Sequence, residues 1–219
     1  LQLGFLKVLP GTQMEQETKE HGLLFMDEPP YEILATKYMP YEDMQFLKRV
    51  ENVLDQTGNS GVFSNILSAL MRMEGLKPFA FYTKLTNWWV ARGYYPQTHN
   101  VKGVAEILAH YIRENCDTHA DELLEILRYD VFVALPGWRP AWLNWQNEFI
   151  FDKVSAFWRN EELVHQYVPA YQFSSWRQIN KTYPIELFKY HWSDGRAGEF
   201  YVLVDNSAGE KKIVELDCL

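Results

Sequence analysis

The chain has 219 residues, of which 47% are hydrophobic and 23% charged, and its formal net charge is −8. A chain of this length can bury a core without support from a metal or a disulfide framework. The acidic balance argues against a nucleic-acid-binding protein, because phosphate binding requires clustered lysine and arginine. No apolar run approaches the roughly 18 residues that a membrane span requires.

The cysteines and histidines predict no metal centre in this chain. Cys116 and Cys218 have no metal-ligand spacing and suggest no disulfide framework, which is typical of a protein in a reducing, cytoplasmic setting. His99, His110 and His119 are separated by 11 and 9 residues, and these spacings fit no zinc signature.

The first nine residues carry apolar side chains on both faces of an alternating pattern. This pattern predicts a strand over Leu1–Leu9 that is buried on both sides in a parallel sheet. Thr12 and Glu15 then form a capping box, which predicts a helix from just after Gly11 to Gly22. A strand, a short loop and a capped helix make up the unit of an α/β barrel.

The middle of the chain changes from extended segments to a helical period. Leu23–Met26 and Tyr31–Tyr38 are short extended candidates on either side of a Pro-Pro pair. From Pro40 onward, apolar residues recur every three or four positions, which indicates amphipathic helices. We expect six helices: over 40–58, 62–73 and 78–92, after an N-cap at Asn100, after an N-cap at Thr118, and near 160–168.

The last 35 residues predict three strands that are separated by turn residues. These strands cover Ile185–Trp192, Phe200–Val204 and Lys211–Leu216, and consecutive turns of this kind favour an antiparallel meander. The sequence therefore predicts a mainly helical α+β chain. Residues 1–30 form a strand and helix, residues 31–180 a helical domain, and residues 181–219 a meander packed on the helices.

Four stretches carry a resemblance to a known family: LQLGFLKVLPGT, PPYEILATKYMPYED, NSGVF and KPFAFY. Together they resemble the C-terminal region, a domain of unknown function, of cobalamin-binding radical S-adenosylmethionine (SAM) proteins. Some of these proteins carry the name anaerobic Mg-protoporphyrin IX monomethyl ester oxidative cyclase. The resemblance implies that Leu1–Leu9 is the last strand of a partial α/β barrel and that a helical domain follows it.

The resemblance also implies the chemistry of the parent protein, an iron–sulfur oxidoreductase or methyltransferase. Such a protein cleaves SAM reductively with a 4Fe-4S cluster, uses cobalamin, and performs a methylation or a ring-forming oxidation. The family's Cys-x3-Cys-x2-Cys and Asp-x-His-x2-Gly motifs are absent from this sequence. We therefore expect no cofactor in this fragment and no catalytic residue. The radical SAM and cobalamin-binding domains would lie upstream in the same chain, and this part would shape the substrate side of the active site.

Lys7 and Thr12 are the predicted contacts of SAM or substrate. A lysine near the C-terminal end of a barrel strand lies where barrel enzymes place their chemistry, and the following helix start favours an anion. The alternative for Lys7 is an edge lysine whose ammonium extends to solvent.

Trp142 and Trp145 are the candidate pocket aromatics, able to stack on a flat ligand. Their spacing, continued by Phe149, is also that of a helix, so an aromatic core stripe is the alternative.

A different class of function stays open from the sequence. The chain could be a non-catalytic module that binds a partner protein or forms a homodimer, with the faces of Leu1–Leu9 as contact surface.

Overall fold

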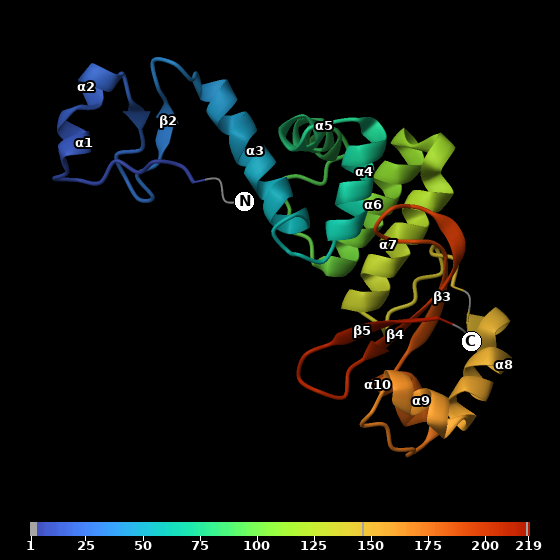
Figure 1. Ribbon diagram of the computed structural model, residues 1–219. Helices are drawn as coiled ribbons and strands as arrows, with labels where there is room; N and C mark the ends of the chain where they lie inside the picture. The colour runs from blue at the N-terminus through green and yellow to red at the C-terminus, as the bar shows by residue number, and fades with distance from the viewer. Residues whose placement is uncertain (1–3, 146, 218) are drawn as a thin grey trace. The chain divides into compact units, whose positions relative to one another are not determined.

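The computed structural model describes residues 4–145, 147–217 and 219, without the side chains of residues 147–149. In this part of the chain the fold is α+β, with ten α-helices and two small antiparallel sheets (Figure 1). The chain divides into two compact units. Unit 1 comprises Leu1–Gly61 and Leu76–Asn100, and unit 2 comprises Val62–Gly75 and Val101–Leu219.

The prediction of a parallel strand at the start of the chain is wrong for residues 4–9. Lys7 forms only an isolated antiparallel bridge with Glu32. The Val8 amide donates to the Tyr31 carbonyl at 2.8 Å, and the Ile33 amide donates to the Leu6 carbonyl at 3.0 Å. The apolar alternation thus serves an antiparallel pairing with residues 31–33. Residues 1–3 of the predicted strand lie outside the described residues.

The helix expected after Gly11 is two single turns, α1 (Gln13–Gln16) and α2 (Thr18–His21). The capping box is not formed as predicted, because the Thr12 hydroxyl donates to the Leu9 carbonyl at 2.7 Å. The Glu15 carboxylate instead accepts the Gly11 amide at 2.7 Å. The predicted end is confirmed: Gly22 closes α2 in the left-handed conformation, with φ 59°.

Most of the other predicted elements are confirmed with small shifts of their ends. They are β1 (Leu24–Phe25), β2 (Ile33–Ala35), α3 (Tyr41–Thr57), α4 (Ser64–Glu74), α5 (Pro78–Ala91), α6 (Val101–Asn115), α7 (Ala120–Ala134) and α9 (Glu161–Tyr167). Thr118 does not cap α7, because it lies within a 3-10 turn, Asp117–His119, that precedes this helix.

Two helices were not predicted, α8 (Asn147–Arg159) and α10 (Trp176–Thr182). The predicted meander is confirmed as β3 (Ile185–Tyr190), β4 (Ala197–Asp205) and β5 (Lys212–Leu216), all antiparallel in the order β3-β4-β5. The division of the chain into domains at residues 30 and 180 stays a prediction.

The core of unit 1 is built mainly by α3 and α5. Val53 on α3 and Phe81, Leu85 and Trp89 on α5 are fully buried. Between residues 4 and 39, by contrast, only Val8 and Ile33 are buried among the apolar side chains. The N-terminal segment therefore adds little to this core.

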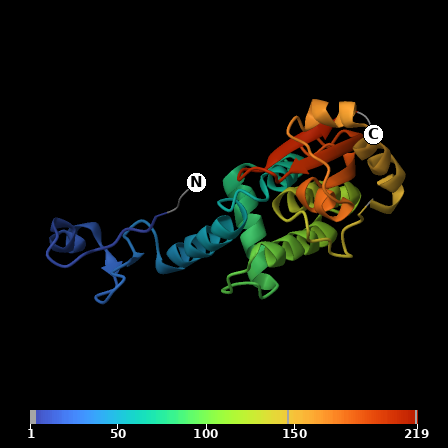
Figure 2. The same ribbon diagram turned by 90° about the horizontal axis from the view of Figure 1, so that it is seen from below.

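The sheet of unit 2 is covered on both faces, which explains the continuous burial of β3. Its alternating side chains enter two separate clusters. Ile185, Leu187 and Leu203 pack with residues of α8, α9 and α10, whose ribbons lie beside the sheet in Figure 2. Phe188 and Val202 belong to the other cluster, which includes α7. A two-residue period thus places Glu186 on the α7 face, in the interior.

No helix in the described ranges combines the length and apolarity that crossing a bilayer would require.

Candidate functional site

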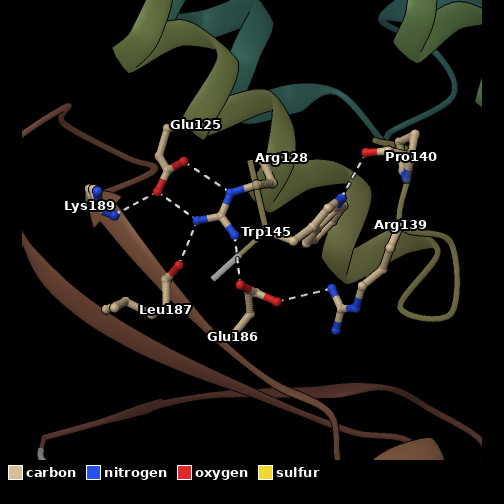
Figure 3. A network of polar contacts seen from close by, with 8 residues as sticks. All are labelled: Glu125, Arg128, Arg139, Pro140, Trp145, Glu186, Leu187 and Lys189. Carbon is tan, nitrogen blue, oxygen red and sulfur yellow. Dashed lines mark hydrogen bonds and ion pairs between the residues drawn. The ribbon is translucent and has the colours of Figure 1, made fainter. Parts of the chain in front are cut away.

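A buried arginine joins α7 to the sheet of unit 2. Arg128 is fully buried, and its Nη2 and Nε donate to the Glu125 carboxylate at 2.6 and 3.0 Å. Its Nη1 donates to Glu186 on β3 at 2.8 Å, and Nη2 also donates to the Leu187 carbonyl at 2.5 Å. Figure 3 shows the guanidinium between the two carboxylates. A buried charge is tolerated only when it is paired in this way.

A second arginine extends this network toward a cleft. Arg139, in the loop after α7, lies with its Nη1 3.1 Å from the second oxygen of Glu186. Its guanidinium also lies over the ring of Trp145, 4.5 Å from the centroid. Burial lowers the pKa of Arg139, Glu186 opposes this shift, and Arg128 adds to it. Two arginines and two carboxylates balance in charge, so the network, defined by Glu125, Arg128, Arg139 and Glu186, is electrically neutral.

The network connects segments that line a cleft. Glu125 accepts the Lys189 backbone amide at 2.7 Å, in addition to the Arg128 bonds. Lys189 lies near the end of β3, whereas Glu186, which contacts Arg128 and Arg139, lies at its start. The network thus holds both β3 and the loop carrying Arg139 to α7. Both of these segments contribute to the cleft described next.

The cleft has a volume of about 840 Å³ and lies entirely within unit 2. Four segments line it: the loop after α7, α8, α10, and the start of β3. The lining residues are Pro136, Gly137, Arg139, Ile150, Phe151, Asp152, Val154, Ser155, Trp158, Arg159, Trp176, Asn180, Pro184 and Ile185. This volume falls in the range typical of small-molecule sites.

The lining combines aromatic walls with two guanidinium groups. Trp158 is buried at 3% exposure, whereas Phe151 and Trp176 are 68% and 43% exposed. Seven described residues of α8 line the cleft, and three of them, Asp152, Ser155 and Arg159, recur at intervals of three and four on one helix face. Arg139 and Arg159 supply positive charge, and Asp152 is the acidic side chain among the described lining residues. The arrangement can hold an apolar body and pair with a charged group on it.

The predicted SAM or substrate contacts lie in unit 1, away from these residues in the sequence. Lys7 is exposed, and its backbone forms the isolated bridge with Glu32. Thr12 is partly buried and donates its hydroxyl to the Leu9 carbonyl. Their assignment to a SAM or substrate site stays a prediction.

The predicted pocket aromatics lie in a loop and do not line the cleft. Trp142 contacts the ring of Trp138 edge-on, with the centroids 5.9 Å apart. The Trp145 indole nitrogen donates to the Pro140 carbonyl at 3.0 Å (Figure 3). Their helical spacing is not realised as a helix, since α8 begins at Asn147. Trp145 instead stacks against the guanidinium of Arg139.

Sequence reasoning missed the residues that build the cleft. One available signal was Arg128, a charged residue between Leu124 and Val131 on the apolar side of a predicted helix. Another was Glu186, an acidic residue inside an otherwise apolar strand. A charged side chain at either position needs a buried partner of opposite charge. The sequence alone does not show that the two residues pair, because that depends on β3 packing on α7.

Comparison with known families gives one match. Residues 19–203 match the family described as "Protein of unknown function (DUF4080)". No curated protein and no solved structure matches the chain. Because the match covers most of the 219 residues, the chain belongs to the DUF4080 family of proteins of unknown function.

Proposed function

We propose that this chain is the C-terminal, substrate-side part of a cobalamin-dependent radical SAM enzyme of the methyltransferase or oxidative cyclase type. The observation that carries the proposal is the cleft of unit 2, which has the volume and mixed lining of a small-molecule site. The likeness of residues 1–12 and of the three further stretches to the radical SAM proteins supports the family assignment. In this role the chain shapes the substrate pocket and does not run the reaction alone.

The cofactors of the proposed enzyme belong to upstream domains of the same protein. A 4Fe-4S cluster takes at least three cysteine thiolates, whereas this sequence has only Cys116 and Cys218. Among the described residues, no group of three or more His, Cys, Asp or Glu side chains could hold a metal ion. The residues present do not fit the cluster, and no step of the reaction is assigned to them.

The decisive experiment is to read the gene upstream of Leu1 and to assay the complete protein. We expect a Cys-x3-Cys-x2-Cys motif upstream, and reductive cleavage of SAM to deoxyadenosine after anaerobic reconstitution. A complete protein without this motif, or one that reconstitutes a cluster but leaves SAM intact, would contradict the proposal.

A second candidate, a protein-interaction or dimerisation module, is favoured by one feature of unit 1. Large apolar side chains are exposed within its first 41 residues: Leu6 at 46%, Leu9 at 49%, Leu24 at 57%, Tyr38 at 84% and Tyr41 at 51%. A contact surface on this segment would remove these side chains from water. Sedimentation equilibrium of the chain and of its Leu24→Ser variant tests this candidate. A dimer weakened by the substitution supports it, and a wild-type monomer at all concentrations excludes the homodimer.

A further inference from the structure

We infer that the cleft of unit 2 binds an organic carboxylate with a flat, aromatic body. This inference names the ligand class of the cleft and so rests on the proposed substrate-side role. It is carried by three features of the described lining: its aromatic walls, its two guanidinium groups, and the placement of Asp152.

The walls of the cleft fit a flat apolar body. The indoles of Trp158 and Trp176 come from α8 and α10, and Ile150, Val154 and Ile185 add aliphatic surface. Trp176 is 43% exposed, although an indole of this size is ordinarily well buried. A ligand ring that covers this indole would remove apolar surface from water and gain stacking contacts.

Among the described lining residues, Arg139 and Arg159 carry positive charge and Asp152 carries negative charge. The positive charge of Arg139 is balanced by Glu186, at 3.1 Å, within the network. Arg159 is exposed in the last turn of α8, and no hydrogen bond or ion pair of its guanidinium occurs within the described residues. A guanidinium binds a carboxylate through two parallel hydrogen bonds, which makes Arg159 the anchor for the ligand's acid group.

Asp152 is the one acid among the lining residues that the structure describes, and its position sets the direction of the ligand. Asp152 lies seven residues before Arg159 on the same face of α8, or roughly 10 Å along the helix axis. A ligand carboxylate bound at Arg159 therefore lies far from the Asp152 carboxylate. A ligand with its negative charge at the centre of the ring system would lie closer to Asp152 and be repelled by it. Ser155 lies between the two on this face and offers a hydroxyl to a polar substituent of the ring.

A matched set of three probes tests the inference on this chain. They are β-naphthoate, β-naphthylmethanol and β-naphthylmethylammonium, which share one ring system and differ in charge. Tryptophan fluorescence or calorimetry measures the affinity of each probe. We expect β-naphthoate to bind most tightly and the ammonium probe least tightly.

Variants assign the binding to the cleft. Arg159→Gln should weaken β-naphthoate roughly ten-fold and leave the neutral alcohol nearly unchanged, because it removes only the charge-assisted bonds. Trp176→Ala should weaken all three probes. Arg177→Gln is the matched control, since this exposed α10 arginine does not line the cleft and should change none of the affinities.

Several outcomes would overturn the inference. They are equal affinity for all three probes, tightest binding of the ammonium probe, no binding at millimolar concentration, or a loss that is equal in the Arg159→Gln and Arg177→Gln variants. The proposed function is tested by a separate experiment on the complete protein. It fails if the cysteine motif is missing or if SAM is not cleaved. Selective β-naphthoate binding could therefore persist in a chain that belongs to no radical SAM enzyme.

Discussion

Arg128 connects α7 to β3 within unit 2. Its guanidinium is bonded to the side chain of Glu125 on its own helix, and to the side chain of Glu186 and the carbonyl of Leu187 on β3. A buried pair of this kind contributes little net stability when intact, since desolvation offsets the attraction. Removing one member is costly, because an uncompensated charge stays in the interior.

The first prediction concerns the stability contribution of Glu186. Glu186→Gln keeps the shape of the side chain but leaves Arg128 and Arg139 without the shared carboxylate, so it should destabilise the chain by on the order of 3 kcal/mol. Glu199→Gln is the control. The Glu199 carboxylate is 66% exposed and 3.9 Å from Lys153, so its removal should cost less than about 0.5 kcal/mol. Urea denaturation measures both values, and equal losses would contradict a structural role for the network.

A second buried acid, Asp130, caps α4 from a distant part of the chain. Its carboxylate accepts the Ile66 backbone amide at 3.0 Å and the Asn65 side-chain amide at 2.7 Å. Burial raises the pKa of Asp130 to about 7, and the hydrogen bonds from Asn65 and Ile66 oppose this rise. The folded chain therefore holds this proton at pH values where the unfolded chain has released it.

The second prediction follows from the sign of this shift. The contribution of Asp130 to stability should be largest below the ordinary pKa of an aspartate, near 4, and should fall as pH rises toward 7, by up to about 1.4 kcal/mol per pH unit. Asp130→Asn keeps an acceptor for the Ile66 amide but cannot titrate, so its stability should lose this slope. Denaturation of both proteins at pH 4.5, 6 and 8 tests this. Parallel pH profiles would show that Asp130 titrates at its ordinary pKa.

At the scale of elements, the turn between β3 and β4 has a defined backbone requirement. Gly195 has a φ of 76°, which side-chain-bearing residues rarely adopt, and its amide donates to the His191 carbonyl at 2.8 Å. A Cβ atom here would lie 2.0 Å from the Glu122 carboxylate oxygen on α7. That side chain can move, so the backbone conformation is the main cost.

The third prediction uses this turn and a matched glycine. Gly195→Ala should destabilise the chain by about 1–2 kcal/mol, mainly through the strained left-handed conformation. Gly209→Ala, in the turn between β4 and β5, should be nearly neutral, because nothing lies within 4 Å of a Cβ atom there. Thermal unfolding of the two variants measures the difference. If both substitutions proved neutral, the turn would tolerate a side chain and the positive φ would not be required.

The elements that sequence patterns predicted well are those whose apolar period is complete within the element. The stripe of α3 is an example, with Val50 and Leu54 buried. The strands β3 and β4 were predicted from the turn residues that bound them. The first strand failed because apolar alternation does not distinguish parallel from antiparallel pairing, and residues 6–8 pair with residues 31–33. The short α10 was missed because its one buried residue, Ile179, gives no period.

The cleft could not be predicted for a related reason. Its lining comes from the loop after α7, α8, α10 and β3, which are separated along the chain by loops without a recognisable motif. Arg139 and Arg159 look like ordinary polar residues in the sequence. Their common placement depends on the sheet lying between α7 and the C-terminal helices, which is a property of tertiary packing.

At the scale of the whole molecule, the described part of the N-terminal segment contributes few side chains to the core. The fourth prediction is that deletion of residues 1–26 leaves a helical, cooperatively melting protein, because Val8 is the one buried apolar residue that this part of the chain contributes among residues 4–26. Circular dichroism and thermal melting of the truncated chain check this. Loss of the helical signal would mean that α3 and α5 need the segment in order to fold.

The fifth prediction is that the upstream domains, and not this chain, bind the cluster and the corrin. Iron, sulfide and corrin are to be measured after anaerobic reconstitution of the complete protein and of residues 1–219, side by side. We expect one 4Fe-4S cluster and one corrin in the complete protein, and neither in the 219-residue chain, whose two cysteines cannot ligate a cluster. Stoichiometric cluster or corrin uptake by the 219-residue chain, or a complete protein that takes up neither, would contradict the substrate-side role in a radical SAM enzyme.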